Sequence, residues 1–386
     1  MLIGIAGKTN TGKTTFFSAS TMIDAEISNR VFTTIEPNTG IAFVKTQCVC
    51  RHFNVKCTPK NSKCVDGTRL VPIKLMDVAG LVPGAHLGKG MGNQFLGDIA
   101  NADAIIHVVD ISGSTDENGS PVLAGTADPK SDIEFFEEEI DYWILGIIQK
   151  GLGMKRIPAP LPDIISKQLT GLNISHEVVE KTIIKTGLTT SSDEYDFLDF
   201  ARLLRELSKP MIIAANKIDI KEGADKYEAL KNKYANMMPC SAETELALRK
   251  AEHAGLIKYI PGSSSFEIIG NISERQKKAF EFIGEMMKKH GSTGVQQILD
   301  KCVFDLLNMI VVYPVENEHK LSDKKGNVLP DAFLVKQGTT AHGLAYMIHE
   351  DIGKKFVSAI DAKTGRHVSA NYVLKDGDVI SVKSGR

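Results

Sequence analysis

The residues best suited to chemistry form a short stretch near the start of the chain, Gly7-Lys8-Thr9-Asn10-Thr11-Gly12-Lys13-Thr14. Its spacing is G-x-x-x-x-G-K-[ST], and it lies between an apolar run at residues 2–6 and the apolar pair Phe16-Phe17. The glycines let the backbone approach phosphate oxygens, and the N–H groups that follow supply positive potential. Lys13 is expected to reach the β- and γ-phosphates, while the hydroxyl of Thr14 coordinates Mg²⁺. The stretch, together with the adjacent Thr15, therefore predicts a nucleoside triphosphate site between a strand and a helix.

Two further groups of residues have the chemistry to bind the γ-phosphate and a metal ion. Thr33-Thr34 falls in the loop after the first predicted helix, and Thr34 is a candidate Mg²⁺ ligand and γ-phosphate sensor. Asp77-x-x-Gly80 follows a predicted strand at residues 71–76. We expect Asp77 to hold Mg²⁺ through a water molecule. The N–H of Gly80 is expected to meet the γ-phosphate only when that phosphate is present.

A fourth group, Asn216-Lys217-Ile218-Asp219, ends the apolar run at residues 211–216 and predicts which base is bound. The carboxylate of Asp219 can accept hydrogen bonds from both N1–H and the 2-amino group of guanine, whereas adenine offers neither donor in that arrangement. Lys217 is expected to lie along the base, and Ser241-Ala242 to donate a backbone N–H to the guanine carbonyl. The set therefore predicts GTP rather than ATP.

The elements that must position these groups are strands of a parallel sheet, because open α/β sheets bind ligands at the carboxyl ends of their strands. Continuous apolar runs at residues 104–110 and 211–216 are typical of strands buried on both faces. More chain lies between these runs than one crossover helix needs. Helical periodicity predicts an inserted helical subdomain there, with helices at 133–149, 164–172, 177–186 and 195–207.

The C-terminal part of the chain has a different pattern. After predicted helices at 273–289 and 295–309, short strands at 310–313, 332–336, 357–361 and 379–382 surround one helix at 340–353. The predicted fold class is α/β: a doubly wound P-loop NTPase sheet, an inserted helical subdomain and a small α+β C-terminal domain. The predicted boundaries are 1–132 and 208–265 for the P-loop domain, 133–207 for the insertion, 266–308 for a helical connector and 309–386 for the C-terminal domain.

Composition places the chain among ordinary globular proteins. Of its 386 residues, 42% are hydrophobic and 24% are charged, and the formal net charge is −1. No global attraction to nucleic acid or to an acidic membrane is therefore expected. The sequence shows neither a signal-peptide pattern nor an apolar run of about twenty residues. Six cysteines without a secretion signal indicate reduced thiols or metal ligands in the cytoplasm.

With these motifs in this order, the chain resembles the Obg/YchF group of translation-factor-class GTPases. The residues that support the resemblance are Phe32-Thr-Thr-Ile-Glu-Pro-Asn38, Asp77-Val-Ala-Gly-Leu-Val-Pro-Gly-Ala-His86 and Gly90-Met-Gly-Asn-Gln-Phe-Leu96. The C-terminal segment resembles the β-grasp TGS domain, named for threonyl-tRNA synthetases, GTPases and SpoT enzymes. The resemblance implies GTP hydrolysis with Mg²⁺, and contact with ribosomes, ribosomal RNA or tRNA through the TGS-like domain and the helical insertion. YchF itself prefers ATP because its base box lacks the Lys and Asp that are intact here, so that trait is not carried over.

The resemblance also bears on how hydrolysis would proceed, with Lys13, Thr34, Gly80 and His86 as the catalytic set. Leu81 stands where Ras-type enzymes place a water-orienting Gln, and its side chain cannot do that work. His86 matches a histidine proposed to act in YchF-like proteins; the alternative is a solvated histidine that contacts a partner. Asn10 matches the position that coordinates K⁺ in related GTPases; the alternative is a turn-forming Asn. Turnover is expected to be slow without a partner.

Two further features leave alternatives open. Cys48, Cys50, Cys57 and Cys64 crowd one insertion between two strands. They either bind structural Zn²⁺ or remain reduced thiols, and the spacing favours thiols because it is not that of two Cys-x-x-Cys knuckles. Scattered basic residues of the C-terminal domain either contact RNA or form a solvated face. These residues are Lys354, Lys355, Lys363, Arg366 and Lys383.

Two functions from different classes follow. The first is a cytoplasmic GTPase, with a monomer favoured, that binds ribosomes or RNA in one nucleotide state and has no membrane partner. The second is an RNA- or protein-binding adaptor whose nucleotide is structural, and Leu81 in place of a Gln keeps this function open. ATP hydrolysis, as in YchF, is disfavoured by Asp219.

Overall fold

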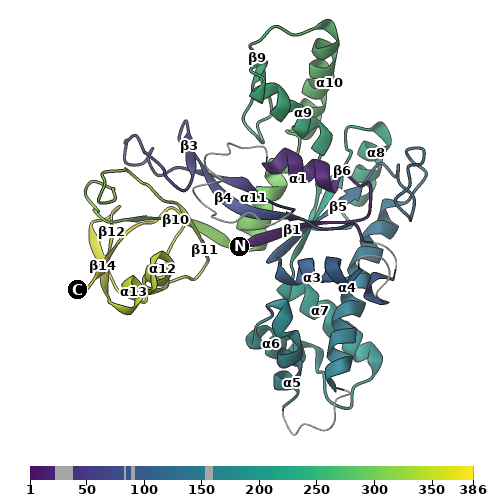
Figure 1. Ribbon diagram of the computed structural model, residues 1–386, viewed down its shortest axis with the longest axis horizontal. Coiled ribbons are helices and arrows are strands. Elements are labelled where there is room, and N and C mark those ends of the chain that lie inside the picture. The colour runs from purple at the N-terminus through teal and green to yellow at the C-terminus, as the bar shows by residue number, and fades with distance from the viewer. Residues whose placement is uncertain (22–37, 82–83, 88–91, 153–159, 386) are drawn as a thin grey trace. The chain divides into compact units, whose positions relative to one another are not determined.

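The computed structural model describes residues 1–21, 38–81, 84–87, 92–152 and 160–385, and Figure 1 follows its elements along the chain. The chain divides into two compact units. The first holds the described residues of 1–40 and 74–298, and the second holds those of 41–73 and 299–386. Thr33 and Thr34, which the sequence assigns to Mg²⁺ and the γ-phosphate, lie outside the described residues.

The main sheet has the strand order β2-β4-β1-β5-β6-β7, with β3 paired to β4. The pairs β4–β1, β1–β5, β5–β6 and β6–β7 are parallel, whereas β3 and β4 form an antiparallel hairpin. Every residue of β5 is buried, as its continuous apolar run predicts for a strand covered on both faces. The strands are β1 (Leu2–Ala6), β2 (Thr39–Gln47), β3 (Lys63–Val65), β4 (Thr68–Asp77), β5 (Ala104–Asp110), β6 (Met211–Asn216) and β7 (Met237–Pro239).

Helices cover both faces of the sheet. Figure 1 shows α1 (Lys13–Thr21) and α3 (Gly92–Asn101) on opposite sides of β1. α8 (Lys221–Leu230) follows β6, and α9 (Ala242–His253) packs against α1. α9 begins at Ser241, whose side chain accepts a hydrogen bond from the N–H of Thr244. The N-termini of α1 and α9 thus stand at the carboxyl ends of strands, where a doubly wound sheet binds its ligand.

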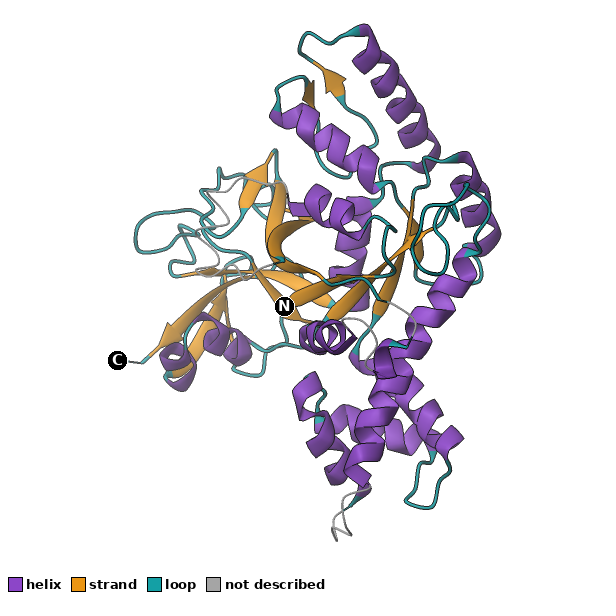
Figure 2. Cartoon of the chain, turned by 45° about the vertical axis from the view of Figure 1, so that its right-hand side comes forward, coloured by secondary structure: helices purple, strands orange, loops and turns teal. Residues whose placement is uncertain are grey.

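The segment between β5 and β6 forms the helical insertion that its periodicity predicts. Its helices are α4 (Pro129–Leu152), α5 (Leu161–Gln168), α6 (His176–Thr186) and α7 (Glu194–Ser208), and Figure 2 shows them in purple. α6 starts at a Ser175 cap and ends at Gly187, whose φ of 68° suits glycine. α7 starts with a capping box between Asp193 and Asp196. Aromatic and aliphatic side chains of α4 and α7 meet in one apolar core.

Beyond β7 the chain adds a short hairpin and two helices. β8 (Ile257–Lys258) pairs with β9 (Glu267–Ile268), and α10 (Glu274–His290) starts with a capping box. α11 covers Val295–Lys301, and one π-helical turn follows at Cys302–Leu306. The prediction of a single helix over 295–309 is wrong at its end. Asn308 has a left-handed φ of 49°, which no helix continues through, and Met309 already begins a strand.

The C-terminal part of the second unit is a five-stranded mixed sheet with two short helices. Its strand order is β11-β10-β14-β12-β13; β10 and β14 are parallel, and the other pairs are antiparallel. The helix predicted over 340–353 is divided in two, because His349 is extended (φ −165°, ψ 143°) between them. The elements are β10 (Met309–Val315), β11 (Phe333–Lys336), α12 (Ala341–Ile348), α13 (Glu350–Lys354), β12 (Phe356–Asp361), β13 (Arg366–Val368) and β14 (Val379–Ser384). The predicted fold class is confirmed.

Candidate nucleotide-binding site

The loop between β1 and α1 has a backbone that requires its two glycines. Gly7 has φ 143°, and a Cβ there would lie 2.4 Å from the carbonyl oxygen of Val108. Gly12 has φ 98°, and a Cβ there would lie 2.2 Å from Nδ2 of Asn216. Both positions combine a left-handed φ with a crowded neighbour, so only glycine fits. The loop can therefore wrap a phosphate with its N–H groups, as its spacing predicts.

Lys13, Thr14 and Asp77 come together at the phosphate end of the site. Nζ of Lys13 donates to the carbonyl oxygen of Lys8 at 2.8 Å, and Oγ1 of Thr14 donates to Oδ2 of Asp77 at 2.8 Å. The other carboxylate oxygen of Asp77 is buried and has no hydrogen-bond partner among the described residues. An unpaired carboxylate oxygen beside a hydroxyl is the donor set that Mg²⁺ prefers, so these residues fit that ion.

Burial disfavours both charges at this point. It lowers the pKa of Lys13 to about 8, although the negative charge of Asp77 opposes the shift. It also raises the pKa of Asp77 above its usual value, against the hydrogen bond from Thr14 and the charge of Lys13. A bound phosphate favours the charged lysine and a bound cation favours the carboxylate, so the ligands supply the charges that burial leaves unbalanced.

Gly80 and Leu81 place the backbone after β4 against the phosphate-binding loop. A Cβ on Gly80 would lie 2.6 Å from Oγ1 of Thr9, and the N–H of Leu81 donates to the carbonyl oxygen of Gly7 at 3.2 Å. The side chain of Leu81 is 1% exposed and belongs to the apolar core of the first unit. It therefore faces away from any attacking water.

Asn216 holds the base end of the site to the phosphate-binding loop. Its Nδ2 donates to the carbonyl oxygen of Thr11 at 2.9 Å, and its Oδ1 accepts from the N–H of Ala242 at 2.9 Å. Lys217 has a left-handed φ of 68°, and its Nζ donates to Oδ2 of Asp110 at 2.9 Å and to the carbonyl oxygen of Asn10 at 3.2 Å. The motif thus joins the ends of β1, β5, β6 and β7.

Asp219 is half-exposed, and no donor in the described part of the chain reaches its carboxylate. It is therefore free to accept hydrogen bonds from a base. The N–H of Ser241 donates to the carbonyl oxygen of Thr293 at 2.9 Å, and that of Ala242 donates to Asn216. Either N–H must exchange its partner to reach a guanine carbonyl, and that assignment stays a prediction.

His86 lies in a short 3-10 helix (Ala85–Leu87), where one carboxylate of the helical insertion binds it. Glu139 of α4 accepts from the N–H of Gly84 at 2.6 Å and from the N–H of His86 at 2.9 Å. Nδ1 of His86 lies 2.6 Å from the same carboxylate, and the ring stacks on Tyr142 with the ring centroids 5.3 Å apart. Because Glu139 accepts at Nδ1, Nε2 is left as the nitrogen that can act on water or a partner.

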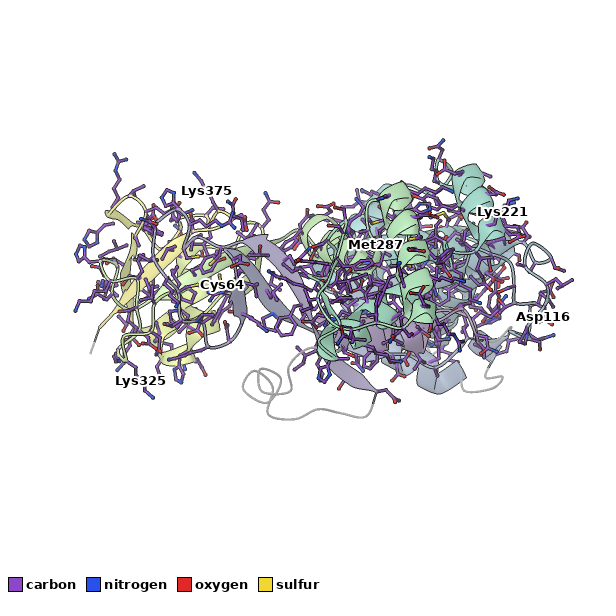
Figure 3. All side chains as sticks on the ribbon, turned by 90° about the horizontal axis from the view of Figure 1, so that it is seen from above. Cys64, Asp116, Lys221, Met287, Lys325 and Lys375 are labelled. Atoms are coloured by element: carbon purple, nitrogen blue, oxygen red, sulfur yellow. The ribbon has the colours of Figure 1, made fainter. Side chains whose placement is uncertain are left out.

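The loop between β5 and α4 packs on the phosphate-binding loop. Nδ2 of Asn10 donates to the carbonyl oxygen of Gly119 at 2.9 Å, so the side-chain oxygen remains for a cation. Nζ of Lys8 donates to Oδ1 of Asp132 at 2.7 Å, and Lys8 is only 4% exposed. The ammonium of Lys8 thus points into the protein, and its backbone alone can face a phosphate. Asp116, labelled in Figure 3, lies on the same loop.

Sequence reasoning missed two carboxylates that support this site. Glu139 and Asp132 both lie on α4 and are 5% and 9% exposed. Buried acidic residues are rare unless they are paired, and Glu139 falls between Phe136 and Ile140 on the apolar face of the helix. An acidic residue on the apolar face of a predicted helix was the sequence signal that could have identified Glu139. It could show that Glu139 has a partner, but not that the partner is His86, 53 residues away.

Four thiols meet in the second unit. The Sγ atoms of Cys48, Cys50, Cys57 and Cys64 all lie within 4.8 Å of one another, and Figure 3 labels Cys64. A cluster of four cysteines at this spacing could hold a metal ion. Cys240 and Cys302 are buried, as their apolar surroundings predict.

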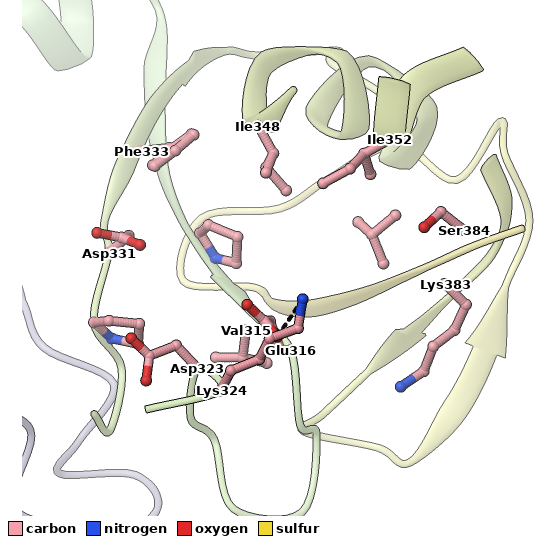
Figure 4. Close-up of a pocket in the computed structure, with 13 residues that line it drawn as sticks. Val315, Glu316, Asp323, Lys324, Asp331, Phe333, Ile348, Ile352, Lys383 and Ser384 are labelled. Atoms are coloured by element: carbon pink, nitrogen blue, oxygen red, sulfur yellow. Dashed lines mark ion pairs between the residues drawn. The ribbon is translucent and has the colours of Figure 1, made fainter. Parts of the chain in front are cut away.

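A pocket of about 420 Å³ opens in the C-terminal domain, as Figure 4 shows. Apolar side chains such as Phe333 and Ile348 line it together with three carboxylates, those of Glu316, Asp323 and Asp331. Lys324 pairs with Glu316 at 3.7 Å. Lys383 lines the pocket as well, and Asp323 pairs with Lys60, so the charges of the lining are largely balanced and do not favour a nucleic-acid phosphate.

The basic residues proposed for RNA contact differ in whether a carboxylate of the described residues pairs with them. Lys354 pairs with Glu350 at 2.6 Å, and Lys383 pairs with Glu318 at 2.7 Å. Lys363 and Arg366 are exposed at the turn between β12 and β13. The turn is therefore the best place for an RNA backbone on this domain, and RNA contact stays a prediction.

No helix within the described ranges is both long enough and apolar enough to cross a lipid bilayer.

Comparison with protein-family models divides the chain in agreement with the motifs. A model described as a 50S ribosome-binding GTPase matches residues 2–140. A model described as an Obg-like GTPase YGR210-like, G4 motif-containing domain matches residues 214–317. A TGS domain model matches residues 324–384.

Several known proteins are similar to the chain over nearly its whole length. The GTP-binding protein MJ1332 of Methanocaldococcus jannaschii is 48% identical over 99% of both chains, and the GTP-binding protein C428.15 of Schizosaccharomyces pombe is 35% identical over 90% of both. The crystal structure of a GTP binding protein from Pyrococcus horikoshii OT3 is 37% identical, covers 100% of both chains and superposes with a TM-score of 0.79. More distantly, the ribosome-binding ATPase YchF of Mycoplasma genitalium is 29% identical over 98% of both chains.

Proposed function

The chain belongs to the Obg-like GTPases of the YGR210 and MJ1332 branch, and we propose that it hydrolyses GTP to GDP and phosphate as a nucleotide-switched factor on ribosomes or RNA. The observation that supports GTP hydrolysis best is the arrangement around two carboxylates. Asp77 meets Thr14 at the phosphate end, and Asp219 at the base end has no hydrogen-bond partner among the described residues. Both ends of one nucleotide therefore have a matching acceptor or ligand.

The phosphate end would stabilise the charge that develops during phosphoryl transfer. The N–H groups of the loop from Gly7 to Thr14 and the ammonium of Lys13 face the β- and γ-phosphates. Mg²⁺, held by Thr14 and Asp77 and by Thr34, would neutralise negative charge on the phosphate oxygens. The N–H of Gly80 donates to the γ-phosphate and is released when that phosphate leaves, which links the nucleotide state to the shape of the following loop.

The base end would select guanine through Asp219. Its carboxylate accepts from two donors on guanine that adenine lacks, while Asn216 keeps the strand ends together and Lys217 lies along the base. The distant YchF relatives are named as ATPases. The intact Asn-Lys-x-Asp box of this chain favours GTP instead.

His86 would orient the attacking water in place of the missing glutamine. Glu139 accepts from Nδ1 and from two backbone N–H groups, so it fixes both the ring and its loop. Nε2 can then hold a water proton when the loop meets the γ-phosphate. Asn10 would offer its side-chain oxygen to K⁺, which would neutralise charge between the phosphates.

The partner proposed is a ribosome or its RNA, and the protein is expected to act as a cytoplasmic monomer. Support comes from the TGS domain match and from the more distant YchF proteins, which are named ribosome-binding. The test is co-sedimentation of the full chain with ribosomal subunits in a non-hydrolysable GTP analogue or in GDP. Binding that requires the analogue is the expected result. If the chain does not sediment with ribosomal subunits in either nucleotide, the ribosome is removed from the proposal.

A second candidate, an adaptor with a structural nucleotide, rests on the buried side chain of Leu81, which cannot position water. Multiple-turnover hydrolysis of GTP by the wild-type chain and by His86→Ala separates the two. A clear loss of turnover in His86→Ala supports the GTPase. Equal, very slow turnover in both proteins, with GDP retained after gel filtration, supports the adaptor.

A further inference from the structure

The insertion between β2 and β4, residues 48–67, brings four thiols to one point; we call it the cysteine hairpin. The four Sγ atoms lie within 4.8 Å of one another, and those of Cys50 and Cys64 are 3.9 Å apart. Four thiolates about 2.3 Å from one Zn²⁺ in tetrahedral geometry lie about 3.8 Å from each other. A disulfide would need its sulfurs about 2.05 Å apart. The spacing therefore fits four ligands of one ion.

A buried cation beside the thiols supports this geometry independently. Arg69 is fully buried, and its Nη1 lies 4.0 Å from Sγ of Cys48. Its Nη2 donates to the carbonyl oxygen of Leu329 at 2.7 Å, and its guanidinium lies 5.5 Å from the ring centroid of Tyr313. Within the described residues no carboxylate forms an ion pair with it, although its charge acts on Asp331 and lowers the pKa of that carboxyl against the larger effect of burial. A buried guanidinium requires a counter-charge, and a divalent ion with four thiolates has a net charge of −2.

The cysteine hairpin has little apolar core to hold it together. Residues 51–60 alternate between exposed and half-exposed, while Cys48 and Cys50 are 1% and 8% exposed. Most of its internal hydrogen bonds are local, such as the N–H of Val55 to the carbonyl oxygen of Cys50 at 3.0 Å. Its two ends are joined by the N–H of Cys48 to the carbonyl oxygen of Gly67 at 2.8 Å and by the guanidinium of Arg51 to the carbonyl oxygen of Asp66. Short segments that cannot bury a core commonly depend on a metal ion or a disulfide.

The same hairpin binds the C-terminal domain within the second unit. The N–H of Thr58 donates to the carbonyl oxygen of Val328 at 2.8 Å, and the N–H of Val328 donates back to Oγ1 of Thr58 at 2.7 Å. The N–H of Lys60 donates to the carbonyl oxygen of Pro330 at 2.7 Å. Asn61 exchanges two hydrogen bonds with the backbone of Ala332, at 3.0 and 3.1 Å. Every hairpin residue in these bonds lies between Cys57 and Cys64.

We propose that Cys48, Cys50, Cys57 and Cys64 bind one structural Zn²⁺, which holds residues 57–64 in the shape that pairs with residues 328–332. Four thiolates in tetrahedral geometry select zinc or iron–sulfur centres. A cluster of several irons would attach its thiolates to different ions and spread them further apart than this. The metal thus ties the C-terminal domain to the cysteine hairpin, a role separate from nucleotide hydrolysis.

The first test measures metal in the full chain purified without chelators. One zinc ion per chain is expected by elemental mass spectrometry. The double variant Cys57→Ser/Cys64→Ser should lose it, and Cys302→Ala, a buried cysteine outside the cluster, should keep it. Absence of zinc from the purified chain, with no uptake on titration with Zn²⁺ alone, would overturn the proposal. So would bound iron with visible absorbance.

The second test measures amide hydrogen exchange at Thr58, Lys60, Val328 and Ala332, with zinc bound and after its release by a mercurial reagent. Release should speed exchange at these four amides about tenfold or more, because their bonds depend on the shape of the hairpin. Removal of the mercurial from the thiols with excess dithiothreitol, followed by re-addition of Zn²⁺, should restore protection, which keeps the test valid if the double variant does not fold. Unchanged exchange after zinc release would overturn the docking role. GTP affinity is measured in parallel and should stay unchanged, so this result does not depend on the proposed GTPase activity.

Discussion

The two ends of the nucleotide site are prepared for their ligand in opposite ways. At the phosphate end Lys13 is paired with a carbonyl oxygen and Thr14 with one oxygen of Asp77, and of these three side chains only Asp77 keeps an oxygen that has no partner among the described residues. At the base end the amide of Asn216 forms hydrogen bonds to the protein backbone through both its nitrogen and its oxygen. The carboxylate of Asp219, in contrast, accepts no hydrogen bond from the described residues.

This difference separates two properties of the protein. Groups at the phosphate end must exchange partners when any nucleoside triphosphate binds, so they govern affinity and turnover without regard to the base. A single free carboxylate at the base end governs which base is bound. Substitutions at one end should therefore leave the property of the other end unchanged.

The largest effect is expected from Lys13→Ala. Loss of the ammonium removes charge stabilisation from the phosphates, and GTP turnover should fall roughly 10³-fold. The ratio of the dissociation constants for GTP and ATP should not change, because both nucleotides lose the same contact. Lys250→Ala, at an exposed position of α9, is the control. If the ratio of the GTP and ATP dissociation constants changes in Lys13→Ala, the two ends of the site do not act independently.

Asp219→Asn should have the complementary effect. Two hydrogen bonds to a charged acceptor are weakened, so the preference for GTP over ATP should fall about 10²-fold. Xanthosine triphosphate, which has a carbonyl in place of the 2-amino group, should gain affinity from the amide. Binding titrations with the three nucleotides measure this. Asp225→Asn, an exposed position of α8, is the control, and equal GTP affinity in both variants would contradict the role of Asp219.

Glu139→Gln tests whether turnover also depends on the helical insertion. The substitution keeps the size of the side chain but weakens three hydrogen bonds to Gly84 and His86, so kcat should fall about tenfold with KM unchanged. Glu138→Gln, an exposed neighbour, is the matched control. Identical kcat values in these two variants would leave His86 without a positioning partner.

Potassium provides a smaller test at the phosphate end. In the wild-type chain K⁺ should raise GTP turnover about fivefold over Na⁺ at equal ionic strength, by neutralising charge between the phosphates. Asn10→Ala should abolish the difference between the two salts. If the variant keeps the full response to K⁺, Asn10 serves only the turn and its bond to Gly119.

The smallest effect concerns stability at the strand beside the phosphate-binding loop. His107 of β5 is buried against Phe136 with ring centroids 4.0 Å apart, and burial together with the charge of Lys13 lowers its pKa to about 3. Below the unfolded-state pKa of 6.5 the unfolded chain binds a proton that the folded chain does not. The free energy of unfolding should therefore decrease as pH falls, by about 1.4 kcal/mol at pH 5.5.

Denaturant unfolding at pH 7.5 and 5.5 measures this loss. His107→Phe keeps the aromatic stacking and should show a loss smaller by that amount, whereas His253→Phe at an exposed position should behave as the wild type. Equal losses in all three proteins would show that His107 is protonated in the folded chain.

Sequence by itself determined the parts of this protein whose signal is local. The phosphate-binding loop, the Asp77 and Asn216 motifs and the buried strands are predicted by short sequence patterns. Gly12, for example, has a left-handed φ and a close neighbour that only glycine tolerates, and the continuous apolar run of β5 is buried along its whole length. The end of α11 was predicted too late and the break at His349 was not predicted, because apolar periodicity continues across residues whose backbone leaves the helix.

Only the tertiary structure decided which distant residues meet. The pairing of His86 with Glu139, of Lys8 with Asp132 and of the cysteine hairpin with residues 328–332 joins positions separated by 53, 124 and about 270 residues. Composition and spacing do not fix such contacts. They depend on how sheet and helices pack, and a buried charge or thiol shows in sequence only that some partner exists.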